Sequence, residues 1–129
     1  MIERLDLQDL SVGWRTISVK AGLTLRHSLG VAPLNEVEVL IVGGKDEEVW
    51  GDLNDLVIFN TATEKASKLK QPSTAAWPFL AGEFPCQQVE KDRVMAIDAR
   101  SKRMIEYRYD GQLNMTVTIL ENLHPVLGD

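Results

Sequence analysis

Apolar and polar positions alternate along much of this chain with the two-residue period of β-strands. Ile105, Tyr107 and Tyr109 form one such series near the C-terminus. The stretch from Val37 to Val42 is mostly apolar and β-branched, which predicts a strand buried on both faces. No segment keeps a helical period over several turns, so the pattern predicts an all-β protein.

The middle of the chain divides into four expected strands, at residues 28–34, 37–42, 53–60 and 65–70. Asn35-Glu36 has the polarity of a tight turn between the first two strands. Gly43-Gly44 follows the second strand, and we expect this pair to end it. Glycine accepts positive φ and a close backbone approach, which the end of a strand against its neighbours requires.

A strand-closing apolar residue followed by a short turn-forming one recurs at Leu5-Asp6, Phe59-Asn60 and Tyr109-Asp110. The intervals are roughly 50 residues, which suits four short strands with their loops. We therefore expect one all-β region over 1–129, made of a half unit at 2–20, a full unit at 26–70 and a degenerate unit at 86–121. The strands expected in the outer units are 2–7, 14–19, 86–89, 93–97, 104–109 and 116–120.

The block 26–69 resembles a Kelch repeat, through Arg26-His27-Ser28-Leu29-Gly30, the Gly43-Gly44 pair and Asn60-Thr61-Ala62-Thr63. The resemblance implies a β-propeller of four-stranded blades. About two and a half blades do not close a ring, because propellers have four to eight. The chain would then be a piece of a longer protein, or would complete a ring with other copies or chains. The alternative is another antiparallel fold, such as a β-sandwich.

Net charge and cysteine content limit the classes of partner and the cellular compartment that we expect. The net charge of −5 argues against a main role in nucleic-acid binding, which depends on Lys and Arg. There is no apolar run of membrane-spanning length and no secretory signal pattern, so no membrane partner is expected. Cys86 is the only cysteine, which excludes an intrachain disulfide and favours a reducing compartment. These features predict a cytoplasmic protein.

Catalytic patterns are missing from the sequence. No glycine-rich phosphate loop is present, and His27, His124 and Cys86 do not have metal-ligand spacing. We read Cys86 as an inert thiol rather than a nucleophile activated by histidine. No catalytic residue, metal or cofactor is predicted, and a protein-binding or scaffold module is favoured over an enzyme. The alternative is an enzyme or ligand-binding propeller whose site is completed by other blades or chains.

The predicted contact surface combines an acidic loop, 45–52, with the connection 72–84, on one face of the protein. Tryptophans in such loops are frequent binding anchors, although both could instead fold back over their own blades, and the loop could simply be solvated. A partner would carry a basic surface, and Kelch-like propellers commonly act as interaction platforms, including ubiquitin-ligase adaptors and cytoskeletal scaffolds. The predicted contact residues are Asp46, Glu47, Glu48, Trp50, Asp52, Trp77 and Phe79.

Overall fold

The computed structural model describes residues 2–17, 26–46, 51–73, 76–78, 80, 85–98 and 101–122. Apart from one 3-10 turn, all regular elements in these ranges are β-strands, which confirms the predicted all-β class. In chain order they are β1 (Ile2–Leu5), η1 (Leu10–Val12), β2 (Trp14–Ile17), β3 (Arg26–His27), β4 (Gly30–Pro33), β5 (Glu38–Asp46), β6 (Asp52–Asn60), β7 (Lys65–Lys68), β8 (Cys86–Glu90), β9 (Arg93–Asp98), β10 (Arg103–Tyr109) and β11 (Met115–Asn122).

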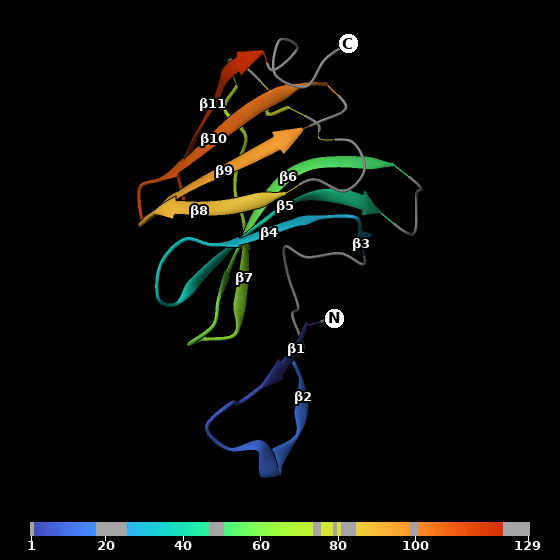
Figure 1. Cartoon of the computed structure of the whole chain (residues 1–129), viewed down its shortest axis with the longest axis vertical. Coiled ribbons are helices and arrows are strands. Elements are labelled where there is room, and N and C mark those ends of the chain that lie inside the picture. The colour runs from blue at the N-terminus through green and yellow to red at the C-terminus, as the bar shows by residue number, and fades with distance from the viewer. Residues whose placement is uncertain are drawn as a thin grey trace.

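The strands form three antiparallel sheets, none of which closes on itself (Figure 1). The hairpin sheet contains β1 and β2. The central sheet has the order β3-β5-β6-β7, with β4 beside β3 along the same edge of β5, and the C-terminal sheet has the order β11-β10-β9-β8. The C-terminal sheet is a meander, in which each strand pairs with the next one along the chain, and the central sheet follows the same pattern from β4 to β7, whereas β3 pairs with β5. The expected strand 28–34 is shorter, because Ser28 adopts a positive φ of 55° and separates β3 from β4.

The expected strands 37–42 and 53–60 are confirmed as neighbours by the register of β5 and β6. Ile41 lies opposite Val57, and Val39 lies opposite Phe59. Ile41 and Val57 are both buried although they point away from the C-terminal sheet, because the hairpin sheet covers them. Residues 40–42 of the apolar run are therefore buried in the middle layer as predicted, whereas Val37 at its start is 40% exposed.

Gly43 and Gly44 do not end the second strand, contrary to the prediction. They lie inside β5, where the register with β6 shifts between Val42 and Gly44 in a β-bulge. Gly43 has a φ of +53°, and a Cβ placed on it would be 2.8 Å from the carbonyl oxygen of Leu53. The glycines thus allow the strand to bend and continue to Asp46, which is the usual effect of a bulge.

Replacing Gly43 by Ala is expected to lower the free energy of unfolding by about 2–4 kcal/mol, through left-handed strain and the collision with the Leu53 carbonyl. Gly111 is a matched control, since its φ is +83° but no atom lies within 4 Å of a Cβ built there. Gly111→Ala should therefore cost only about 1 kcal/mol. Urea unfolding of the two variants measures the difference, and equal losses would show that the Leu53 contact is unimportant.

The recurring landmarks of the sequence are equivalent turns in the structure. The Oδ1 atom of Asn60 accepts hydrogen bonds from the backbone N–H groups of Ala62 and Thr63. Asp6 accepts one from Gln8, and Asp110 accepts one from Gln112. Each side chain folds the chain back locally, as Asn and Asp do in such turns. The same device therefore joins β1 to β2, β6 to β7 and β10 to β11.

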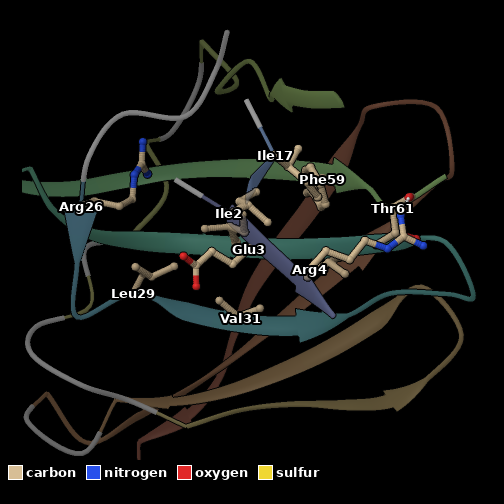
Figure 2. A pocket seen from close by; sticks show the side chains of 11 residues that line it. Ile2, Glu3, Arg4, Ile17, Arg26, Leu29, Val31, Phe59 and Thr61 are labelled. Atoms are coloured by element: carbon tan, nitrogen blue, oxygen red, sulfur yellow. Dashed lines mark hydrogen bonds between the residues drawn. The ribbon is translucent and has the colours of Figure 1, made fainter. Parts of the chain in front are cut away.

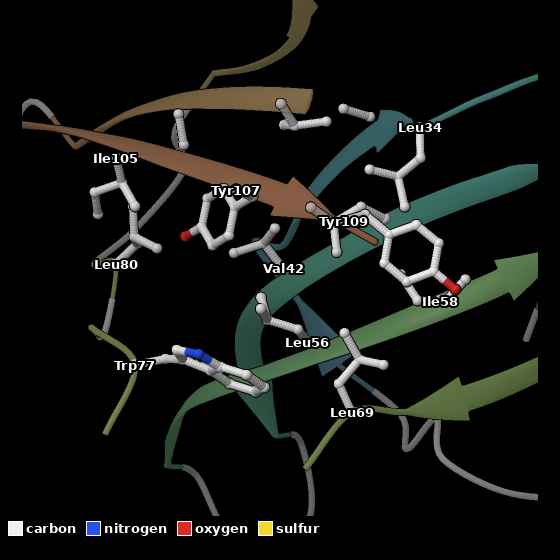
Figure 3. Packing of buried hydrophobic residues seen from close by; sticks show 14 residues of the cluster. Leu34, Val42, Leu56, Ile58, Leu69, Trp77, Leu80, Ile105, Tyr107 and Tyr109 are labelled. Carbon is white, nitrogen blue, oxygen red and sulfur yellow. The ribbon is translucent and has the colours of Figure 1, made fainter. Parts of the chain in front are cut away.

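The main core lies between the central and C-terminal sheets, which pack face to face (Figure 3). From the central sheet, Leu40, Leu56 and Ile58 point into it, and from the C-terminal sheet Ile105 and Tyr107 meet them. Such packing occurs both between stacked propeller blades and between the layers of a β-sandwich. Propeller blades and a β-sandwich would differ in what covers the other side of the central sheet.

Candidate docking groove

The second face of the central sheet is only partly covered. The hairpin sheet lies against it, and Ile17 of β2 packs in a small apolar cluster with Ile41, Val57 and Phe59. Ile2 of β1 adds to this cluster. The hairpin therefore buries the side of the sheet formed by β5 and β6, but it has only two strands with which to cover it.

Polar contacts attach the hairpin sheet to the turn between β6 and β7. The Arg15 guanidinium donates two hydrogen bonds to the carboxylate of Glu64, at 2.8 and 3.1 Å. Arg4 donates to the carbonyl oxygen of Thr61 at 2.9 Å. The hydrogen bond from Arg15 lowers the pKa of Glu64, so the contact keeps its charge at neutral pH. These bonds hold β1 across the central sheet.

A groove of about 560 Å³ remains between β1 and the central sheet (Figure 2). Leu29 and Val31 border it along β4, and Val39 continues its apolar surface onto β5. Val31 is 51% exposed, although Ile41, its partner across the strand pair, is buried. The full lining is Ile2, Glu3, Arg4, Ile17, Arg26, Leu29, Val31, Val39, Ile41, Phe59 and Thr61.

The groove is bordered by a strand edge that has no pairing partner among the described residues. In the part of the chain that the structure describes, β1 pairs with β2 and with no other strand. Half of the backbone N–H and C=O groups of a strand point to each side, so the other edge of β1 offers groups of both kinds for pairing. An apolar surface beside an open edge is the combination that β-strand addition uses in peptide recognition.

A buried ion pair borders the groove at Arg26. Its guanidinium donates to both carboxylate oxygens of Asp55, at 2.7 and 3.1 Å, and to the carbonyl oxygen of Gly43 at 3.2 Å. The Arg26 side chain is 3% exposed and that of Asp55 is 8% exposed. This pair ties β3 to β6 across the bulge in β5.

The structure describes only part of the predicted contact surface. Asp46 ends β5, and its backbone N–H donates to the carbonyl oxygen of Gly51 at 2.9 Å, which closes the acidic loop at its base. Asp52 begins β6 opposite Lys45, and its side chain lies outside the described residues. The remaining predicted contact residues of both loops, apart from Trp77, also lie outside the described residues: Glu47, Glu48, Trp50 and Phe79.

Trp77 belongs to the core rather than to an exposed surface. It is 6% exposed and packs in the main cluster, with its ring on the side of Leu56 (Figure 3). The Asn54 amide donates to the carbonyl oxygen of Trp77 at 2.7 Å, and the backbone N–H of Trp77 donates to the side-chain oxygen of Gln71. The alternative interpretation, in which the tryptophan folds back over its own strands, therefore describes this residue. The predicted role of Trp77 as an exposed anchor is therefore wrong.

Cys86 has the properties of an inert thiol. Burial raises its pKa to about 11, the opposite direction from that of an activated nucleophile. Its side chain packs against the main core cluster. In the residues that the structure describes, no group of three or more His, Cys, Asp or Glu side chains is arranged to hold a metal ion.

Sequence reasoning did not find the groove residues Leu29, Val31 and Val39. Their apolar character is equally consistent with a buried position inside the expected strands 28–34 and 37–42. A signal was present, because a unit with only its last two strands must leave part of its neighbour's face uncovered. Identifying the uncovered side chains requires knowing which face each residue occupies, and this depends on the register.

No protein-family model matches the chain, and no curated protein matches it. Within the described ranges, no helix has the length and apolar character needed to cross a membrane.

Proposed function

We propose that this chain is a protein-interaction or scaffold module built from Kelch-like propeller blades. The observation that carries the proposal is the groove beside β1, an apolar surface with an open strand edge on a sheet whose other face is fully packed. Exposed apolar surface of this kind marks interaction sites in soluble proteins. The module would bind other β-structured chains through its incomplete face.

The blade assignment is supported by corresponding side chains of successive units, which point in the same direction relative to the preceding unit. Val57 and Phe59 point toward the hairpin sheet that precedes them in the chain. Tyr107 and Tyr109, at the corresponding positions of the next unit, point toward the central sheet that precedes them. Each unit thus packs the same face on its predecessor, as the blades of a propeller do and as the repeats of a stacked array do in general.

The acidic loop remains a proposed second contact region for a partner with a basic surface. Its proposed anchor is Trp50, and Asp46, Glu47 and Glu48 would mainly speed association through long-range attraction. This contribution should fall as salt concentration rises.

Association is the property that tests the module. Light scattering after size-exclusion chromatography is expected to give an average mass above 14.4 kDa that rises with protein concentration, because the incomplete sheet face favours contact with other copies. A chain that stays monomeric over the whole concentration range, and that also resists denaturation, would contradict the proposal.

A further inference from the structure

We propose that the groove binds a two-stranded antiparallel β-hairpin from another polypeptide, with one strand paired to the open edge of β1 and aliphatic side chains facing the central sheet. This inference rests on the proposed function and names the class of partner for the same site. It follows from comparing the two faces of the central sheet, and from the strands that the hairpin sheet lacks relative to the two larger sheets.

The complete sheets provide the template. The strands that correspond to β1 are β6 and β10, and each is paired on both sides. β6 lies between β5 and β7, and β10 lies between β9 and β11. Among the described residues, β1 has only the later neighbour, β2. The missing strand is therefore one that runs antiparallel to β1, in the place of β5 or β9.

The opposite face of the central sheet shows what the missing hairpin contacts. There the β8–β9 hairpin lies beside β4, and Gln88 donates to the carbonyl oxygen of Leu34 at 2.8 Å. The backbone N–H of Asp92 donates to the same oxygen, and the Asn35 amide donates to the Asp92 carboxylate at 2.8 Å. On the groove side, no described segment occupies the corresponding place over β4. Val31 is left exposed for this reason.

The inner hairpins of this chain, β4–β5 and β8–β9, cannot supply the missing hairpin unless their own sheets unfold. β4 and β5 are already joined to β6, and β8 and β9 to β10. A second copy has the same arrangement, so within the described residues it can contact this face but has no spare pair of inner strands to add to the edge of β1. The proposed occupant is a hairpin of another polypeptide, with side chains that alternate between aliphatic and polar.

Docking is selective for the groove, because the face of the C-terminal sheet that no described element covers has different chemistry. Glu106 accepts hydrogen bonds from Arg93 and Arg108, both at 2.6 Å. These bonds lower the pKa of Glu106, so the cluster stays charged. The three residues stand at the positions that Leu40, Leu56 and Ile58 occupy in the central sheet. An aliphatic hairpin fits the groove and not this charged face.

A synthetic peptide with the sequence of residues 28–46, the chain's own inner hairpin, is a suitable probe. Added to the full chain, it should slow amide hydrogen exchange at Ile2–Leu5 by roughly tenfold or more, because strand addition protects the edge amides. A scrambled peptide of the same composition is the control and should leave exchange unchanged. The same exchange rates with either peptide, up to millimolar concentration, would overturn the proposal.

Two surface variants locate the site. Val31→Asp should weaken peptide binding by about tenfold or more, because it places an unpaired charge in the groove. Val89→Asp is the matched control, since Val89 is 48% exposed on β8 of the C-terminal sheet and should bind the peptide normally. Circular dichroism and thermal unfolding confirm that both variants fold. Equal affinity of Val31→Asp and the wild-type chain would overturn the proposal.

These experiments distinguish a failure of the hairpin inference from a failure of the proposed function. If the chain self-associates as expected but the Val31→Asp variant and the β1 amides do not respond to peptide, the module binds through another surface and only the hairpin inference fails. If the chain is a resistant monomer but the peptide protects β1, the groove is a hairpin site and the broader assembly proposal fails.

Discussion

Replacing Arg26 by Met is expected to lower the free energy of unfolding by about 3–5 kcal/mol, the usual cost of removing one partner of a buried ion pair. The Asp55 carboxylate would lose both of its hydrogen bonds from the guanidinium, at 2.7 and 3.1 Å. Lys68 Nζ lies 3.8 Å from Asp55, but its side chain is mostly exposed, so it compensates weakly. Urea denaturation at neutral pH measures the loss.

The double variant Arg26→Met/Asp55→Leu provides the control. Removing both charges should restore much of the stability, because apolar replacements of buried ion pairs are often neutral. The difference between the single and double variants then measures the penalty of leaving the carboxylate without its partner. A loss of less than about 1 kcal/mol in Arg26→Met would show that the pair behaves like an exposed salt bridge.

Replacing Trp77 by Ala is expected to cost about 3–5 kcal/mol, the range for removing a large aromatic side chain from a core. The residue is 6% exposed in the main cluster, so the change would leave a cavity beside Leu56 and Leu69. The variant Trp77→Phe keeps part of the aromatic ring and should lose less. Thermal and urea unfolding of the two variants give the comparison.

The same variant separates the two interpretations of the connection 72–84. A surface anchor would lose binding while keeping its stability. A core residue loses stability first, and any loss of binding follows from unfolding. A Trp77→Ala protein with unchanged unfolding free energy would contradict the packing seen in Figure 3.

The strands themselves could be predicted because their signals are local. The alternation at Ile105, Tyr107 and Tyr109 directly reflects the pleat of a strand that buries one face. The turns at Asn60 and Asp110 form from a side chain and the backbone a few residues later, so they need no distant contact. The run that includes Leu40 and Ile41 likewise indicated burial on both faces.

The course of the chain around Gly43 depended on tertiary structure. The sequence alone indicates a need for positive φ, which both a strand end and a bulge satisfy. What decides between them is the continuation of pairing from Gly44 and Lys45 to β6. The burial of Trp77 is similar, because its core position depends on Asn54 and Gln71 holding the connection against β6.

The sequence by itself therefore determined the all-β class, the positions of the strands and the repeated turns, since each depends on residues close together in the chain. Tertiary structure alone decided where Trp77 points, how β5 passes the glycine pair and that Val31 faces an open groove. These features arise from packing between sheets, where residues far apart in sequence meet in a register that local patterns do not specify.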